Sequence, residues 1–192
     1  MYKSLITNKK LIISKIAIVL LSILPISMIV GNLALNLNII LINLITLLYC
    51  IKNNNWSWIK TDYFKILIIL NFYLIINSTF NFFKNDNFEI DGILRSIGFI
   101  KFILIFFSMS ILISHKDQIS KILLFWSIIV VTVIFDVIFE FFFGHNIFGF
   151  VSLDQTRIVS FFYDENVVGT LLFGIGFITI SFFLQNNISN KY

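Results

Sequence analysis

Six long runs of apolar residues follow one another along the chain and limit what it can fold into. The hydrocarbon core of a bilayer is about 30 Å thick, and about 20 residues of helix cross it. Only helices and closed barrels satisfy their own backbone there, and none of the runs alternates as a barrel strand does. The sequence therefore predicts an all-α polytopic membrane protein. We expect residues 1–192 to form a single transmembrane helical domain with about six spans, near residues 11–30, 33–51, 63–83, 96–114, 122–143 and 167–184.

The composition supports lipid as the main solvent. Hydrophobic residues make up 58% of the chain and charged residues 12%, whereas a soluble domain needs about 25% charged residues. The net charge of +4 is small and spread along the chain, so we predict no nucleic-acid partner. The one cysteine, Cys50, excludes an intrachain disulfide and a cysteine metal cluster.

The orientation follows from lysine and arginine in the short connections, which collect on the cytoplasmic side. With the N-terminus inside, the cytoplasmic side carries ten such residues and the outer side three, which predicts an N-in, C-in topology. The inner set is Lys3, Lys9, Lys10, Lys15, Lys52, Lys60, Lys65, Lys116, Lys121 and Lys191, and the outer set is Lys84, Arg95 and Arg157.

Two predicted outer loops, residues 84–95 and 144–166, contain both arginines of the protein. Arginine suits bidentate recognition of phosphate or carboxylate groups, whereas lysine carries the positive charge elsewhere in the chain. Arg95 and Arg157 are therefore candidate substrate-binding residues.

Asp136 and Glu140 lie in the fifth apolar run, four residues apart, and so share one helix face. Carboxylates within a span are costly and mark a path, a partner or a site. Two interpretations stay open: a polar cavity with a functional role, or a brace for the helix end against Lys101 or an outer arginine. Lys101 itself is placed about one turn into the fourth run, where it either snorkels to the interface or pairs with Asp136.

Residues 144–169 mix apolar stretches with charges, so this segment does not look like a hydrophilic linker. It can rest in the interface or re-enter a protein-lined cavity. His145 has no second ligand at metal-binding spacing, and we predict no metal. The triplet 164–166 precedes the last span, where acidic and asparagine side chains can cap exposed amides.

Four short patterns in this region resemble a known family. They are D-x-x-x-E at 136–140, GHNIFG at 144–149, RIVSFF at 157–162 and DEN-x-x-G at 164–169. They are similar to the pattern of the O-antigen ligase/polymerase family: an aspartate helix, G-x-(D/N)-x-x-G, R-(L/I)-(S/T)-G-x-F and (E/P)-N-x-x-G. The chain departs from it at Glu140, where glutamine is frequent, and at residues 159–161, where it has Val-Ser-Phe and Ser-Gly is commoner, so that the register near Ser160 is imperfect.

The resemblance implies a multi-pass protein of the bacterial inner membrane. Family members transfer or polymerise glycans carried on undecaprenyl pyrophosphate at the periplasmic face, with no nucleotide sugar or required metal, so no cofactor is expected. Arg157 matches the arginine thought to hold the pyrophosphate. Asp136 and Glu140 are then the candidate catalytic residues, and Arg95, His145, Glu165 and Asn166 join Arg157 as candidate substrate-binding residues.

Family members have more spans and a second large periplasmic loop, so the chain resembles the N-terminal half of such a protein. We therefore expect its partners to be the lipid-linked glycan, membrane lipid, and a missing C-terminal half or other polysaccharide-assembly proteins. Two other functions stay open. Asp136 and Glu140 also suit half of a transporter or flippase, and a small membrane subunit could only scaffold its partners.

Overall fold

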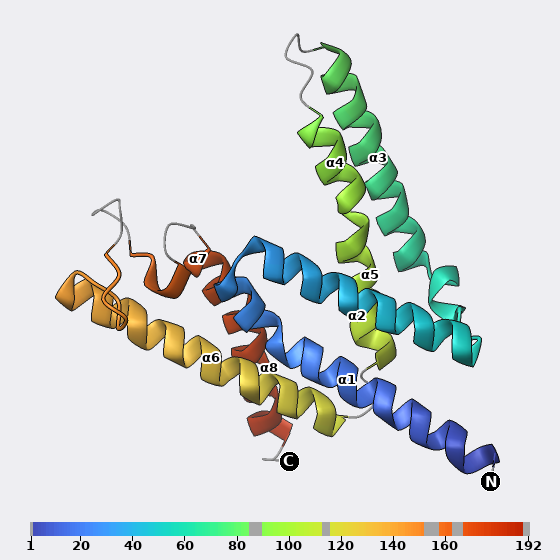
Figure 1. The fold of residues 1–192 in the computed structure, drawn as a ribbon, viewed down its shortest axis with the longest axis horizontal. Helices are drawn as coiled ribbons and strands as arrows, with labels where there is room; N and C mark the ends of the chain where they lie inside the picture. The colour runs from blue at the N-terminus through green and yellow to red at the C-terminus, as the bar shows by residue number, and fades with distance from the viewer. Residues whose placement is uncertain (1, 85–89, 113–115, 152–157, 163–166, 190–192) are drawn as a thin grey trace. The chain divides into compact units, whose positions relative to one another are not determined.

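The computed structural model describes residues 2–84, 90–112, 116–151, 158–162 and 167–189 (Figure 1). Within these ranges the chain is helical and contains no β-strand, which confirms the predicted all-α fold. The long helices are α1 (Tyr2–Val30), α2 (Asn32–Asn53), α3 (Asp62–Lys84), α4 (Asp91–Gly98), α5 (Ile100–Leu112), α6 (Lys116–Phe143) and α8 (Phe177–Ser189). The short ones are η1 (Ser57–Lys60), η2 (Ser160–Phe162), α7 (Val168–Leu171) and the π-helical turn η3 (Leu172–Gly176).

Each of the six predicted spans falls on helix. Among the described residues, four helical stretches are long and apolar enough to cross a membrane: Asn32–Asn53, Asp62–Lys84, Asp91–Leu112 and Gln118–Phe143. Two further apolar helices, Lys15–Val30 and Val168–Leu184, are shorter. The protein is therefore an all-α membrane protein, and the number of crossings and the N-in, C-in orientation stay predictions.

The chain divides into two compact units. The first consists of Met1–Ala17 and Ile39–Ser114, and the second of Ile18–Asn38 and His115–Tyr192. The prediction of a single transmembrane domain stays a prediction.

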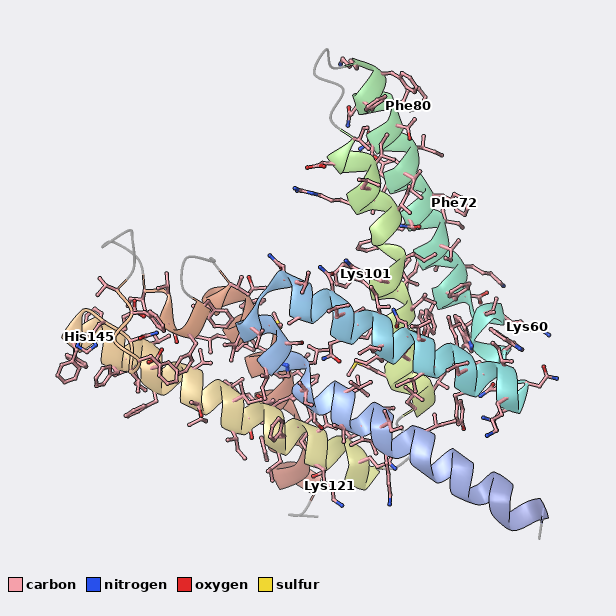
Figure 2. All side chains as sticks on the ribbon, viewed as in Figure 1. Lys60, Phe72, Phe80, Lys101, Lys121 and His145 are labelled. Atoms are coloured by element: carbon pink, nitrogen blue, oxygen red, sulfur yellow. The ribbon has the colours of Figure 1, made fainter. Side chains whose placement is uncertain are left out.

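Large apolar side chains cover the outside of the first unit. Phe72 and Phe80 project from α3 and are mostly exposed (Figure 2). A soluble protein would bury most of such a surface, whereas lipid solvates it. The exposed aromatic side chains therefore agree with the membrane assignment.

The fourth predicted span begins earlier than the sequence indicated. Helix α4 begins at Asp91 and ends at Gly98, and α5 begins at Ile100, so that only Phe99 interrupts the helix. Together α4 and α5 form one membrane-length stretch. Lys101 therefore lies near the middle of this stretch, and its placement one turn from the end was wrong. Its ammonium group lies 5.1 Å from the centroid of the Phe102 ring.

Two buried amide side chains donate to backbone carbonyls on either side of the interruption at Phe99. The Asn71 amide donates to the Ser96 carbonyl (2.9 Å), and the Asn43 amide donates to the Lys101 carbonyl (2.9 Å). The Ser96 carbonyl also accepts from the Phe99 N–H at 3.3 Å, so the Asn71 amide adds a second hydrogen bond to it. The two asparagines thus connect α3 and α2 to the broken helix.

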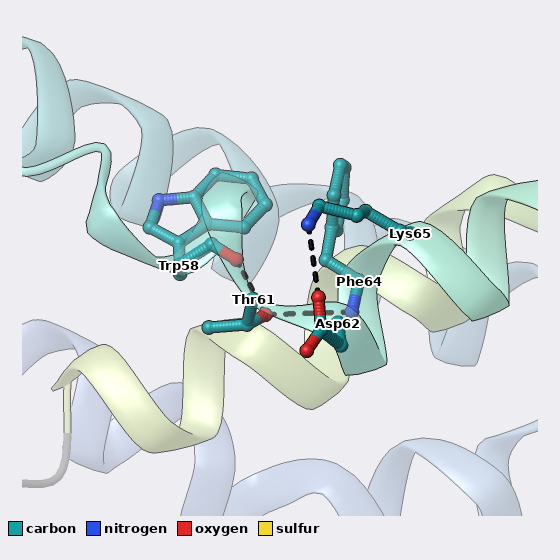
Figure 3. A network of polar contacts seen from close by, with 5 residues as sticks. All are labelled: Trp58, Thr61, Asp62, Phe64 and Lys65. Atoms are coloured by element: carbon teal, nitrogen blue, oxygen red, sulfur yellow. Dashed lines mark hydrogen bonds and ion pairs between the residues drawn. The ribbon is translucent and has the colours of Figure 1, made fainter.

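The turn before α3 caps that helix and closes a small aromatic core. The Thr61 hydroxyl accepts from the Phe64 N–H (3.4 Å) and donates to the Trp58 carbonyl (2.7 Å), while Lys65 pairs with Asp62 at 2.9 Å (Figure 3). Trp58 is buried against Cys50, Ile103 and Phe107, and its ring lies 5.5 Å from the ring of Phe107.

In the second unit, a proline in α1 is compensated by a tryptophan on α6. Pro25 has no N–H to donate to the Leu21 carbonyl one turn earlier. The Trp126 indole N–H donates to that carbonyl instead, at 3.0 Å, and both side chains are buried. Asn38 donates to the neighbouring Leu20 carbonyl at 3.2 Å. Side chains from α6 and α2 thus donate to the α1 carbonyls about one turn before Pro25.

Candidate functional site

The candidate site is built on the end of α6, where two carboxylates face inward. Asp136 is 0% exposed and Glu140 is 5% exposed, whereas Phe135 and Phe141 beside them are mostly exposed. The four-residue spacing puts both carboxylates on one helix face, as the sequence predicted. That face turns toward the segment that follows α6.

Asp136 accepts two hydrogen bonds from this segment. The Ile147 backbone N–H donates to one carboxylate oxygen at 2.8 Å, and the Ser160 hydroxyl donates to the other at 2.6 Å. The two donors lie 11 and 24 residues from Asp136 in the sequence. One side chain therefore connects both described parts of the loop to the helix.

Glu140 holds the second part of the loop through its backbone. The N–H groups of Val159 and Ser160 donate to its two carboxylate oxygens, at 3.2 Å and 2.6 Å. Val159 and Ser160 are both buried. Together with the two bonds to Asp136, each of the four carboxylate oxygens has a donor from the loop.

Asn146 completes the network from the other side of the loop. Its side-chain amide donates to the Ser160 carbonyl at 3.0 Å, and its side-chain oxygen accepts from the N–H groups of Phe148 (3.0 Å) and Phe150 (2.8 Å). Asn146 is only 1% exposed. Its amide thus supports a tight turn and also connects that turn to Ser160.

The backbone of the loop adopts conformations that demand particular residues. Gly144 and Gly149 have φ of 73° and 83°, which glycine adopts without a steric penalty. Ser160 has φ of 51°, which costs of order 1–3 kcal/mol for a residue with a Cβ. Its N–H, hydroxyl and carbonyl all form the bonds described above, and these offset the strain.

The structure places the remaining predicted residues differently. His145 is half-buried at the end of α6 (Figure 2), where its Nδ1 lies 3.0 Å from the Asn146 carbonyl oxygen and its ring 5.7 Å from that of Phe139. Arg95 is exposed on α4 in the first unit. Arg157, Glu165 and Asn166 lie outside the described residues.

The partners of the carboxylates are loop atoms. Their donors are N–H and hydroxyl groups, and both open interpretations, a polar cavity with a functional role and a brace against Lys101 or an outer arginine, stay predictions. Lys101 and Asp136 belong to different units, so an ion pair between them stays a prediction. In the part of the chain that the structure describes, no group of three His, Cys, Asp or Glu side chains could hold a metal ion.

Sequence reasoning did not select Asn146 and Ser160 as site residues. Both stand in the quoted patterns, at the third position of GHNIFG and the fourth of RIVSFF. Their place in these patterns was the only signal in the sequence, and their burial became visible only in the structure.

No protein-family model, curated protein or solved structure matches the chain.

Proposed function

We propose that the protein is an O-antigen ligase/polymerase-like protein of the bacterial inner membrane. It would transfer or polymerise glycans carried on undecaprenyl pyrophosphate at the periplasmic face. The observation that supports this proposal best is the hydrogen-bonded network itself. Asp136, Glu140, Asn146 and Ser160 stand in three of the four sequence patterns that resemble the family, and they contact one another.

Arg157 lies close in the sequence to Ser160, a member of the hydrogen-bonded network. Arg157 lies three positions before Ser160, whose N–H, hydroxyl and carbonyl are all bonded. A guanidinium can bind two phosphate oxygens at once. Arg157 would therefore bind the pyrophosphate of the lipid-linked glycan, and Arg95, His145, Glu165 and Asn166 stay further candidates for substrate contacts.

The proposed reaction is a displacement at the anomeric carbon of the glycan. The acceptor hydroxyl forms the new C–O bond while the bond from that carbon to the pyrophosphate oxygen breaks. The bonding electron pair leaves with the polyprenyl pyrophosphate, and the hydroxyl proton is released to water. Negative charge grows on the leaving pyrophosphate, where a preorganised guanidinium stabilises it most.

Asp136 and Glu140 act in this scheme as positioning residues. Both side chains are buried and each of their oxygens accepts from the loop, so a role as general base would require the acceptor hydroxyl to enter this buried network. The same bonds give less support to a transporter that uses these carboxylates, because a transported ion would compete with four loop donors.

The test replaces the chromosomal gene in its host with Arg157→Ala and Arg157→Lys variants. We expect Arg157→Ala to lower glycan transfer by about 10²–10³-fold, the usual cost of removing one transition-state donor. The lipid-linked glycan should accumulate. Arg157→Lys should recover little, because lysine cannot form the bidentate contact.

Lys84→Ala is the matched control, since it removes one positive charge at the end of α3, outside the site. It should transfer glycan at the wild-type rate. Full activity of Arg157→Ala at a normal protein level in the membrane would contradict the proposal.

A further inference from the structure

We infer that residues 144–151, the segment directly after α6, lie within the membrane with their exposed apolar side chains in contact with lipid. We call this segment the α6 loop. The inference rests on side-chain exposure, backbone hydrogen bonding and continuity with the helix surface. It does not depend on the proposed function.

The side chains of the α6 loop are arranged in the opposite way from those of a loop in water. Its amide, Asn146, is buried, while Phe148 is 73% exposed and Val151 is 59% exposed. Ile147 and Phe150 are exposed as well. A water-facing loop gains nothing from this arrangement, because it hides the polar group and leaves large apolar groups unburied. In lipid the same arrangement is favourable.

The backbone of the α6 loop satisfies the requirement that lipid imposes. Non-helical backbone at membrane depth must find partners within the protein, since lipid offers none. Six N–H groups have acceptors inside the protein. The acceptors are the Glu140 carbonyl for Gly144, the Phe150 carbonyl for Asn146, the Asp136 carboxylate for Ile147, the Asn146 carbonyl for Gly149, and the Asn146 side chain for Phe148 and Phe150.

A loop exposed to water does not need this degree of internal bonding, because water supplies the missing partners. The side chains of Asn146 and Asp136 accept three of the six bonds, and both side chains are fully buried. The two buried polar side chains therefore let the irregular backbone enter an apolar medium. This gives Asn146 a role that its place in the sequence pattern alone did not show.

The exposed surface of the α6 loop continues the lipid-facing surface of α6. Phe141, Phe142 and Phe143 close the helix and are each more than half exposed. Beyond them, an apolar cavity of about 350 Å³ is lined by Ile29, Asn146, Phe148, Phe150 and Phe161. An apolar cavity open on a membrane-facing surface suits part of a lipid acyl chain. The occupant we assign to this surface is therefore bilayer lipid.

The test uses spin labels, and the single cysteine makes it practical. The full chain with Cys50→Ser is reconstituted in vesicles of phosphatidylethanolamine and phosphatidylglycerol. A nitroxide is attached at Phe148→Cys, and its collision rates with oxygen, which partitions into lipid, and with a water-soluble nickel chelate are measured. Val151→Cys is a second site, where a small exposed side chain is replaced and folding is less at risk.

Two references calibrate the measurement. Ile128→Cys reports an exposed position in the middle of α6, and Lys84→Cys reports an exposed polar position at the end of α3. We expect the oxygen-to-nickel ratio at positions 148 and 151 to exceed that at position 84 several-fold and to approach that at position 128. A ratio at both loop positions equal to that at position 84 would place the loop in water and overturn the inference.

Discussion

Replacing each carboxylate with its amide should separate the roles of Asp136 and Glu140. Both Glu140→Gln and Asp136→Asn keep the size of the side chain and replace one acceptor oxygen with an NH₂ group. The two changes differ in what that NH₂ group meets. Glu140 faces two backbone N–H groups, those of Val159 and Ser160, whereas Asp136 faces one backbone N–H group and one hydroxyl.

The expected cost follows from this difference. In Glu140→Gln one backbone N–H must face an NH₂ group, so a hydrogen bond worth about 1.5–3 kcal/mol is lost and a buried donor is left without a partner. We expect the free energy of unfolding to fall by about 2–5 kcal/mol. In Asp136→Asn the Ser160 hydroxyl can rotate and accept from the new NH₂ group. The loss should then be about 1 kcal/mol, the difference between a charged and a neutral hydrogen bond.

The assay is reversible unfolding in mixed micelles, followed by far-UV circular dichroism. Asp62→Asn serves as the control, because Asp62 is an exposed carboxylate paired with Lys65 on the surface of α3. Such a pair contributes at most about 1 kcal/mol. Equal losses in Glu140→Gln and Asp136→Asn, or no loss in Glu140→Gln, would refute the assigned hydrogen bonds.

Two further predictions use the same assay. Trp126→Phe leaves the Leu21 carbonyl without the indole donor and should lower the free energy of unfolding by about 1–2 kcal/mol. The loss should be clearly smaller in a Pro25→Ala background, where the helix supplies its own N–H to that carbonyl. Additive losses in this double-mutant cycle would refute the compensation. Ser160→Ala should be less stable than Ser160→Gly by about 1 kcal/mol, because both lose the hydroxyl but only glycine relieves the positive φ; the reverse order would contradict the assigned backbone conformation.

The sequence alone predicted the helices because the apolar runs are long. A run of about 20 apolar residues has few stable alternatives in lipid. Boundaries were harder to predict. Asp91 and Arg95 read as loop residues, yet they form α4 with the apolar side chains between them. The amides of Asn71 and Asn43 that support the break in this span come from other helices, and no local pattern identifies them.

The candidate site was predictable in part. The spacing of Asp136 and Glu140 fixed their common face, and their cost in a membrane predicted that they would be partnered. Their partners could not be predicted, because the contacts with Ser160 and Ile147 depend on the path of an irregular backbone. Periodicity carries no information about such a path. The proposed role of Arg157 in binding pyrophosphate is supported by the family resemblance and by its place in the sequence.

Arg157 is the residue on which the proposed transfer of glycan from polyprenyl pyrophosphate most depends. The most direct measurement is the release of polyprenyl pyrophosphate from lipid-linked glycan by membranes of the host that carries Arg157→Ala in the chromosome. We predict release at least about a hundredfold slower than in wild-type membranes with the same protein level. Release at the wild-type rate would contradict the proposal.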